Sequence, residues 1–205
     1  MSKKTPSGRN NSNQAKIRVF IAVKLPDHVI RRLSETQQDL KKHGLMIKWT
    51  RSENIHLTLK FLGDIFLEDV GPVCEVIKTS VRGLGPIKLY AGGVGIFPGI
   101  RRPRVLWTGI SGQLDLLEKL HKAIDAGLSS LGFAKDDRRF TGHLTLGRFK
   151  GHHNSEALIK LIDMMKIYAD MALDEFIVDA VSLYKSDLKP SGPIYTDLSR
   201  IRLGQ

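Results

Sequence analysis

The sequence contains a single cysteine, Cys74, so it cannot form an internal disulfide bond. Disulfides are typical of oxidising compartments, and a lone thiol within an apolar helical pattern favours a reducing compartment and a packing role. No apolar run approaches the length of a membrane span, and the N-terminus lacks the hydrophobic block of a secretory signal. We therefore expect a soluble, cytoplasmic protein without membrane attachment.

The sequence also lacks Cys, His and carboxylate residues at the spacing of metal ligands. His152 and His153 are adjacent, so their side chains project in different directions, and no Cys or acidic cluster has ligand spacing with them. A polar loop is the better interpretation of this pair. We expect neither a metal ion nor a cofactor.

Acidic residues are scarce relative to basic ones. Lys and Arg number 32 against 21 Asp and Glu, which gives a formal charge of +11 and a pI of about 9.8. This balance favours a polyanionic partner, although a basic protein without such a partner would look the same on charge alone. The hydrophobic content of 41% is sufficient for a buried core.

Residues 1–15 are polar and contain too few apolar groups to offset the entropy of ordering them, so we expect a disordered tail. Residues 16–205 are expected to form one domain. Lone helical histidines are more often structural than catalytic, and His121 is interpreted in that way. Periodicity and turn signals predict strands at 16–24, 46–49, from 56, 87–95, 105–110, from 143, 176–184 and 194–203, and helices at 27–40, 67–81, 114–131 and 155–168.

One tetrapeptide, His-Leu-Thr-Leu, occurs twice, at residues 56–59 and 143–146. A given tetrapeptide recurs by chance at roughly one position in 10^5, so the repetition is informative. Because side chains alternate along a strand, each copy directs His and Thr to one face and both Leu to the other. We therefore predict that His56, Thr58, His143 and Thr145 form a catalytic face suited to proton transfer at a phosphate.

Basic residues near the two copies are candidates for substrate binding. Lys60 keeps the parity of His56 and Thr58, so in a regular strand its ammonium shares their face and attracts a phosphate; a solvated lysine is the alternative. Arg148 has the opposite parity to His143, and only a bulge at Gly147 would turn it toward the site. Arg101, Arg102 and Arg104 lie in a Pro- and Gly-rich loop that could hold a nucleic acid backbone or simply be solvated.

With these residues in view, the sequence resembles the 2H phosphoesterases, named for two His-x-Thr-x motifs. Within them it is most similar to the bacterial RNA 2′,3′-cyclic phosphodiesterases, also called 2′-5′ RNA ligases. The resemblance spans nearly the whole chain after the tail. Besides the two motifs it rests on residues 18–23 with Leu25-Pro26, residues 54–63, residues 104–107, residues 143–148, residues 183–186 and residues 192–195.

The resemblance implies a bilobal, duplicated α+β fold. Two antiparallel sheets would flank a central groove, with one motif from each lobe facing the groove and helices on the outside. It further implies metal-independent hydrolysis of RNA 2′,3′-cyclic phosphate ends to 2′-phosphate. In that scheme His56 is the acid for the 3′ oxygen, His143 is the base, and Thr58 and Thr145 donate hydrogen bonds to the non-bridging oxygens.

Two other functions fit the same residues. The reverse reaction would join RNA ends through a 2′-5′ linkage, although dilution in water favours hydrolysis. A non-catalytic module that binds a nucleotide or an RNA end would need no pair of proton-transfer groups, which argues against it. The expected partners are RNA ends or small cyclic nucleotides. The absence of heptads and of a long exposed apolar face predicts a monomer.

Overall fold

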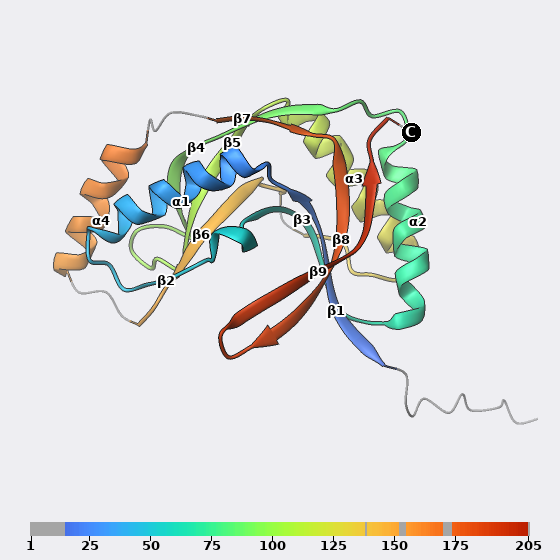
Figure 1. The fold of residues 1–205 in the computed structure, drawn as a ribbon, viewed down its shortest axis with the longest axis horizontal. Helices are drawn as coiled ribbons and strands as arrows, with labels where there is room; N and C mark the ends of the chain where they lie inside the picture. The colour runs from blue at the N-terminus through green and yellow to red at the C-terminus, as the bar shows by residue number, and fades with distance from the viewer. Residues whose placement is uncertain (1–14, 138, 152–154, 170–173, 205) are drawn as a thin grey trace, which may run out of the picture.

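The computed structural model describes residues 15–137, 139–151, 155–169 and 174–204 (Figure 1). Residues 1–14 of the expected tail lie outside this part. Within it, strands and helices follow each other in this order: β1 (Lys16–Lys24), α1 (Asp27–Lys41), β2 (Ile47–Trp49), β3 (His56–Phe66), α2 (Val70–Val81), β4 (Ile87–Phe97), β5 (Val105–Gly112), α3 (Leu114–Ser130), β6 (His143–Phe149), α4 (Ser155–Tyr168), β7 (Asp174–Val178), β8 (Ala180–Lys189) and β9 (Gly192–Arg202), with single 3-10 turns at Ser52–Asn54 and Leu67–Asp69.

Local sequence signals account for most element boundaries. Helix α1 begins directly after Pro26, whose fixed φ suits a helix start, and ends shortly before Gly44, which adopts a positive φ of 69°. The predicted strand at 176–184 is wrong, because the structure divides this segment into β7 and β8 at Asp179. Strand β7 pairs with β4 whereas β8 pairs with β1, so the chain must change direction between them.

The strands form one curled, antiparallel sheet in the order β7-β4-β5-β6-β3-β1-β8-β9, with β2 paired to β6. The expected α+β class is confirmed, but the two expected sheets are continuous. They are joined where Leu57 of β3 pairs with Leu144 of β6. We call β3, β1, β8 and β9 the His56 half-sheet, and β7, β4, β5, β6 and β2 the His143 half-sheet.

The helices cover one side of the sheet, and two of them cross from one half-sheet to the other. Helix α1 follows β1 of the His56 half-sheet but packs against β7 of the His143 half-sheet, next to which α4 packs on β4. Helix α3 follows β5 of the His143 half-sheet and packs against α2 and β3 of the other half, while it also keeps a contact with β4. The two pairs of helices therefore lie at opposite ends of the molecule (Figure 1).

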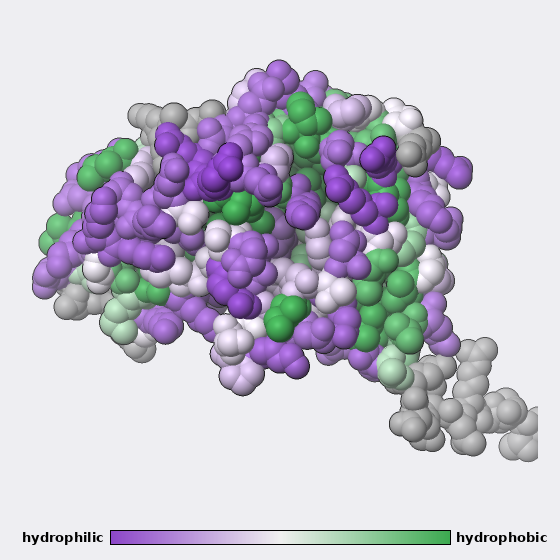
Figure 2. All heavy atoms as spheres, in the orientation of Figure 1, coloured by the Kyte–Doolittle hydropathy of each residue, from purple (hydrophilic) through white to green (hydrophobic). Residues whose placement is uncertain are grey.

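The apolar faces of the helices and strands form one core. On α3 the residues spaced at helical intervals are almost completely buried, with exposed fractions of 0–1% for Leu117, Leu120, Ile124 and Leu128. Leu57 and Leu144 are buried in the same core. The solvent-facing surface over α1 is mainly hydrophilic, as Figure 2 shows. No helix in the described ranges is long and apolar enough to cross a membrane.

Candidate active site

The two motif strands lie side by side in antiparallel orientation at the centre of the sheet. Because Leu57 pairs with Leu144, the register places His56 beside Thr145 and Thr58 beside His143. The leucines of both copies are buried, whereas the four His and Thr side chains lie on the opposite, partly open face. The structure therefore places these four side chains on one face, as the alternation predicts; their catalytic role stays a prediction.

The same short contact orients both imidazoles. His56 Nδ1 lies 2.8 Å from the carbonyl oxygen of Asn54, and His143 Nδ1 lies 2.8 Å from that of Thr141. A carbonyl oxygen only accepts hydrogen bonds, so each Nδ1 is the protonated nitrogen and donates. Each Nε2 is thereby left to exchange a proton with a bound molecule.

Aromatic rings form the walls around each histidine. Phe20 stacks on His56 with ring centroids 4.7 Å apart, and Tyr195 meets His56 edge-on at 5.3 Å. Phe97 meets His143 edge-on at 5.0 Å, and it stacks on Trp107 at 4.8 Å. The sequence segments that carry the resemblance contain Phe20, Trp107 and Tyr195, but the sequence does not indicate their role, because they are distant from the motifs along the chain.

Burial is the main reason that the pKa of His56 falls to about 4; the hydrogen bond to Asn54 opposes the shift, and the neighbouring charge of His143 adds a smaller lowering. The mutual influence of the two imidazoles agrees with their placement on adjacent strands. At neutral pH the His56 ring is therefore neutral, with the lone pair of Nε2 available as a proton acceptor.

Both motif strands contain a β-bulge at the same position. Register moves from Thr58 opposite Ala22 to Lys60 opposite Ile21, so Leu59 is the extra residue. In β6 it moves from Thr145 opposite Trp107 to Gly147 opposite Leu106, so Leu146 is the extra residue. A bulge reverses the alternation beyond it. Phe61 and Arg148 each lie two residues after the extra residue. Both consequently line a cavity beside His56, which we include in the groove between the half-sheets.

The bulge makes the expectation for Lys60 wrong. Its side chain is 4% exposed, and Nζ lies 2.6 Å from Asp125 Oδ1 and 2.9 Å from Asp136 Oδ1. It also donates to the carbonyl oxygen of Ala134 at 2.9 Å. Burial disfavours the ammonium, but the two carboxylates raise the pKa of Lys60 above its ordinary value. Lys60 therefore lies on the helical side of the sheet, away from the groove.

The sequence analysis made the orientation of Arg148 depend on a bulge at Gly147. The structure has a bulge in β6, although its extra residue is Leu146, and Arg148 faces the side of the motif histidines. Gln37 of α1 fixes this bulge, a feature that the sequence analysis missed. Its Nε2 donates to the carbonyl oxygens of Leu146 and Thr50, both at 2.8 Å. The amide of Thr50 also donates to the Leu146 carbonyl, at 2.9 Å. The carbonyl oxygen of the extra residue thus accepts two hydrogen bonds.

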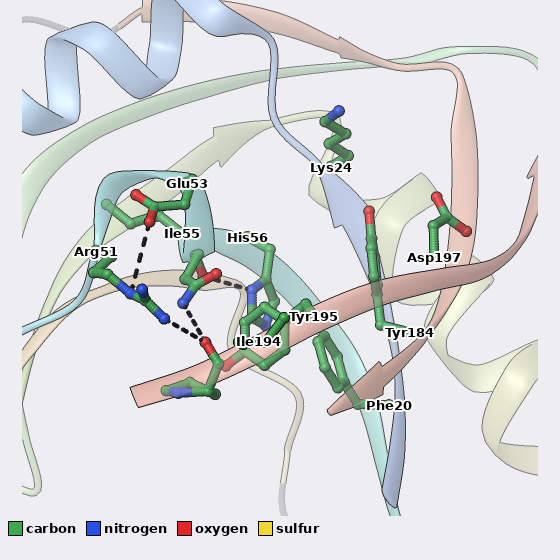
Figure 3. Close-up of a pocket in the computed structure, with 12 residues that line it drawn as sticks. Phe20, Lys24, Arg51, Glu53, Ile55, His56, Tyr184, Ile194, Tyr195 and Asp197 are labelled. Atoms are coloured by element: carbon green, nitrogen blue, oxygen red, sulfur yellow. Dashed lines mark hydrogen bonds and ion pairs between the residues drawn. The ribbon is translucent and has the colours of Figure 1, made fainter. Parts of the chain in front are cut away.

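Two cavities meet at His56. The first, which we call the Tyr184 cavity, has a volume of about 410 Å³ and is lined by Phe20, Lys24, Tyr184 and Asp197 among others. The second, the Arg148 cavity, has a volume of about 230 Å³ and contains both motif threonines. Arg51 and Asn54 donate to the Pro193 carbonyl at 2.8 and 2.9 Å, which fixes the β8–β9 hairpin between the cavities (Figure 3).

The three loop arginines lie at one end of the groove. Arg101, Arg102 and Arg104 are exposed in the connection between β4 and β5. Val105, the first residue of β5, pairs with Arg148, so the loop continues from the Arg148 end of β6. None of the three lines either cavity, and the expected contact with a nucleic acid backbone stays a prediction.

His121, interpreted from the sequence as structural or exposed, is 6% exposed. Its ring stacks on Phe140 at 4.2 Å, and its Nε2 lies 3.3 Å from Asp136 Oδ2. In the described part of the chain no three His, Cys, Asp or Glu side chains converge as metal ligands. His152 and His153 lie outside that part.

A model of the LigT-like phosphoesterase family matches the chain twice, over residues 23–107 and 110–195, once for each motif. An RNA 2′,3′-cyclic phosphodiesterase of Methanothermobacter thermautotrophicus is 34% identical over 188 residues, which cover 92% of this chain and 100% of the relative. A Thermotoga maritima protein of the same name is 35% identical over 180 residues, 87% of this chain and 91% of the relative.

Solved structures share the fold. A crystal structure from Thermus thermophilus has a TM-score of 0.76 at 28% identity and covers 92% of this chain and 100% of its own. The E. coli LigT structure complexed with 3′-AMP has a TM-score of 0.72 at 22% identity, over 93% of this chain and 100% of its own, which shows the fold alone. The chain therefore belongs to the LigT-like phosphoesterases, within the 2H phosphoesterases that its two His-Leu-Thr-Leu stretches resemble.

Proposed function

We propose that this protein hydrolyses the 2′,3′-cyclic phosphate at an RNA end to a 2′-phosphate, without a metal ion. The names of the relatives support the substrate class. The observation that carries the proposal is the pair of imidazoles on adjacent strands. Each is held through Nδ1 by a backbone carbonyl, which leaves Nε2 to exchange a proton with the substrate. This arrangement suits proton transfer at both ends of a displacement at phosphorus.

In the proposed reaction a water oxygen forms a bond to phosphorus while the bond from phosphorus to the 3′ oxygen breaks. His143 Nε2 accepts the water proton, and His56 Nε2–H donates a proton to the 3′ oxygen. The products are a 2′-phosphate monoester and a 3′ hydroxyl group, and the two histidines exchange protons with solvent before the next turnover. These roles follow the resemblance to the family.

The acid role requires His56 to be protonated, whereas burial lowers its pKa to about 4. A phosphodiester anion beside Nε2 favours the imidazolium, because opposite charges in a poorly solvated site raise the pKa of a histidine. We therefore propose that substrate binding protonates His56, so that the acid is present only when there is a leaving group to receive its proton.

The remaining groups stabilise negative charge. Thr58 and Thr145 line the Arg148 cavity together with His56, and their hydroxyl groups would donate to the non-bridging oxygens as charge develops on them. The Arg148 guanidinium, which lines the same cavity, would bind a phosphate of the RNA substrate.

The first experiment is to incubate the purified protein, in EDTA, with a short RNA that ends in a 2′,3′-cyclic phosphate. We expect complete conversion to a 2′-phosphate, identified by chromatography and phosphorus NMR. Formation of the 3′-phosphate alone would mean that the other bond breaks. Loss of activity in EDTA, with recovery on adding a divalent cation, would contradict the metal-free reaction.

A second experiment tests the histidines. Because acid and base catalysis each contribute roughly 10²- to 10⁴-fold, His56→Ala and His143→Ala should each lower kcat by a factor in that range while RNA binding is largely kept. His28→Ala is the matched control, since His28 is exposed and bonds only to the Glu175 backbone among its described hydrogen bonds. Full activity in either motif variant would end the two-histidine proposal.

A further inference from the structure

The two cavities that meet at His56 differ in charge. The Tyr184 cavity is lined by two cationic and two acidic side chains, Lys24 and Arg51 against Glu53 and Asp197. The Arg148 cavity is lined by three cationic side chains, Lys48, Arg51 and Arg148, and by no carboxylate among the described residues. A flexible polyanion is therefore attracted to the second cavity, whereas the first is close to neutral.

The cations of the Arg148 cavity are arranged on neighbouring strands. Lys48 of β2 lies directly opposite Arg148 of β6 in the antiparallel register, and both side chains are exposed. Like charges in directly opposite positions destabilise a sheet. No ion pair of either residue is found in the described part of the chain, so nothing there offsets the repulsion. A bound anion between the two side chains would offset it.

Aromatic residues of the same cavity could stack on bases. Trp49, Phe61 and Tyr195 line it, and Phe61 is 65% exposed, which is unusual for a large apolar ring. Cations that follow a backbone, combined with exposed rings, are the pattern by which proteins hold single-stranded nucleic acid. The Tyr184 cavity also has aromatic walls, but charged side chains of both signs lie beside them.

A terminal nucleotide with a 2′,3′-cyclic phosphate has two further substituents on its ribose. One is the uncharged base, and the other is the 5′ phosphodiester that leads into the negatively charged chain. We infer that the RNA chain on the 5′ side of the terminal nucleotide runs through the Arg148 cavity, and that the terminal base occupies the Tyr184 cavity. This inference deepens the proposed function and rests on it.

The path continues beyond the cavity. Because Val105 pairs with Arg148, a chain that passes Arg148 reaches the exposed loop with Arg101, Arg102 and Arg104. These arginines would then contact phosphates further from the cleaved end, which gives them a role that depends on RNA length.

The test compares two substrates, a 2′,3′-cyclic mononucleotide and a decanucleotide that ends in the same cyclic nucleotide. Lys48→Ala should raise KM for the decanucleotide roughly tenfold at low salt and reduce the slope of log(kcat/KM) against log[salt] by about one. Phe61→Ala should raise the same KM roughly tenfold through lost stacking. Both variants should leave kcat/KM for the mononucleotide within about twofold of wild type.

Lys24→Ala is the matched control, because Lys24 is also an exposed lysine but lines the other cavity. Lys24→Ala should change KM by the same factor for the mononucleotide and for the decanucleotide. An effect of Lys48→Ala that is equal for both substrates would overturn the inferred path. A decanucleotide-specific effect of Lys24→Ala without one of Lys48→Ala would place the chain in the Tyr184 cavity instead, and would also overturn it.

Failure of the proposed function can be separated from failure of this inference by measuring binding. Fluorescence anisotropy with a labelled decanucleotide ending in a 2′-phosphate requires no turnover. If the wild type hydrolyses neither substrate but Lys48→Ala weakens binding and reduces its salt dependence, the proposed hydrolysis is wrong. The inferred path of the RNA chain through the Arg148 cavity is then still supported. If binding by Lys48→Ala matches the wild type at every salt concentration, the path is wrong whether or not hydrolysis occurs.

Discussion

Leu57 of β3 lies directly opposite Leu144 of β6, and this pairing relates the two motifs by an approximate twofold axis. Each histidine consequently neighbours the threonine of the other motif. The relation ends beyond the bulges, where Phe61 occupies the position equivalent to that of Arg148. A phosphate between the histidines thus meets similar groups on both sides, while the rest of the substrate meets different ones.

The threonines give the first prediction. Thr58→Val and Thr145→Val keep the shape of the side chain but remove the hydroxyl donor. Loss of one oxyanion donor lowers kcat by roughly 10²- to 10³-fold in enzymes of known mechanism, and we expect a decrease of that size for each variant with little change in KM. Thr196→Val is the control, since Thr196 is exposed on β9. Unchanged steady-state kinetics in both motif variants would exclude oxyanion stabilisation by these residues.

The lowered pKa of His56 gives a prediction for stability. Its folded-state pKa of about 4 is below the value of about 6.5 for an unfolded histidine. Between these pH values the unfolded chain binds more protons, so the free energy of unfolding should decrease as the pH falls from about 6.5 to about 4. His56→Gln removes this contribution, and urea unfolding across the window should show a weaker pH dependence than in wild type. Identical slopes would argue that His56 is not desolvated in the folded protein.

Lys60 gives a prediction for the core. Lys60→Met leaves Asp125, whose side chain is 16% exposed, without its partner, and removal of one member of a buried ion pair costs about 3 kcal/mol. Lys78→Met breaks the exposed pair with Glu75 and should change the free energy of unfolding by less than about 1 kcal/mol. Chemical denaturation of both variants provides the comparison. Equal stabilities would mean that the buried ammonium contributes little.

Gln37 is predicted to position Arg148 through the bulge at Leu146. Gln37→Leu retains the size of the side chain but removes both hydrogen bonds, so KM for RNA should rise roughly tenfold. Exposed Gln38 supplies the control variant Gln38→Leu. Groups that act as one unit have non-additive effects. Adding Arg148→Ala to Gln37→Leu should therefore cost less than it costs in wild type, and full additivity would contradict the positioning role.

The sequence was sufficient to predict which motif side chains share a face and most elements, because these depend on local alternation and on turn residues. The duplicated tetrapeptide correctly predicted that His56, Thr58, His143 and Thr145 share one face. Alternation failed at Lys60, the residue directly after the first motif. The extra residue of a bulge leaves no clear mark in the pattern, so Lys60 was assigned to the wrong side. For Arg148 the neighbouring glycine did suggest the irregularity.

Other parts of the site could not be predicted, because they depend on contacts between distant segments. Gln37 reaches β6 only because α1 crosses to the His143 half-sheet. Tyr195 reaches His56 only through the β8–β9 hairpin, which Arg51 and Asn54 hold in place. The end of β7 at Val178 is likewise set by a change of pairing partner, and the hydrophobic pattern continues past it without interruption.

The crossing of α1 and α3 has a consequence for how the groove opens. Each half of the molecule is covered by a helix whose chain begins in the other half, so the halves cannot separate about a single hinge without unpacking both helices. We therefore expect the spacing between the imidazoles to stay constant during turnover. Because Arg51 and Asn54 also hold the β8–β9 hairpin, we expect entry and exit of substrate to depend on the exposed arginine loop at the rim, while the centre of the sheet remains rigid.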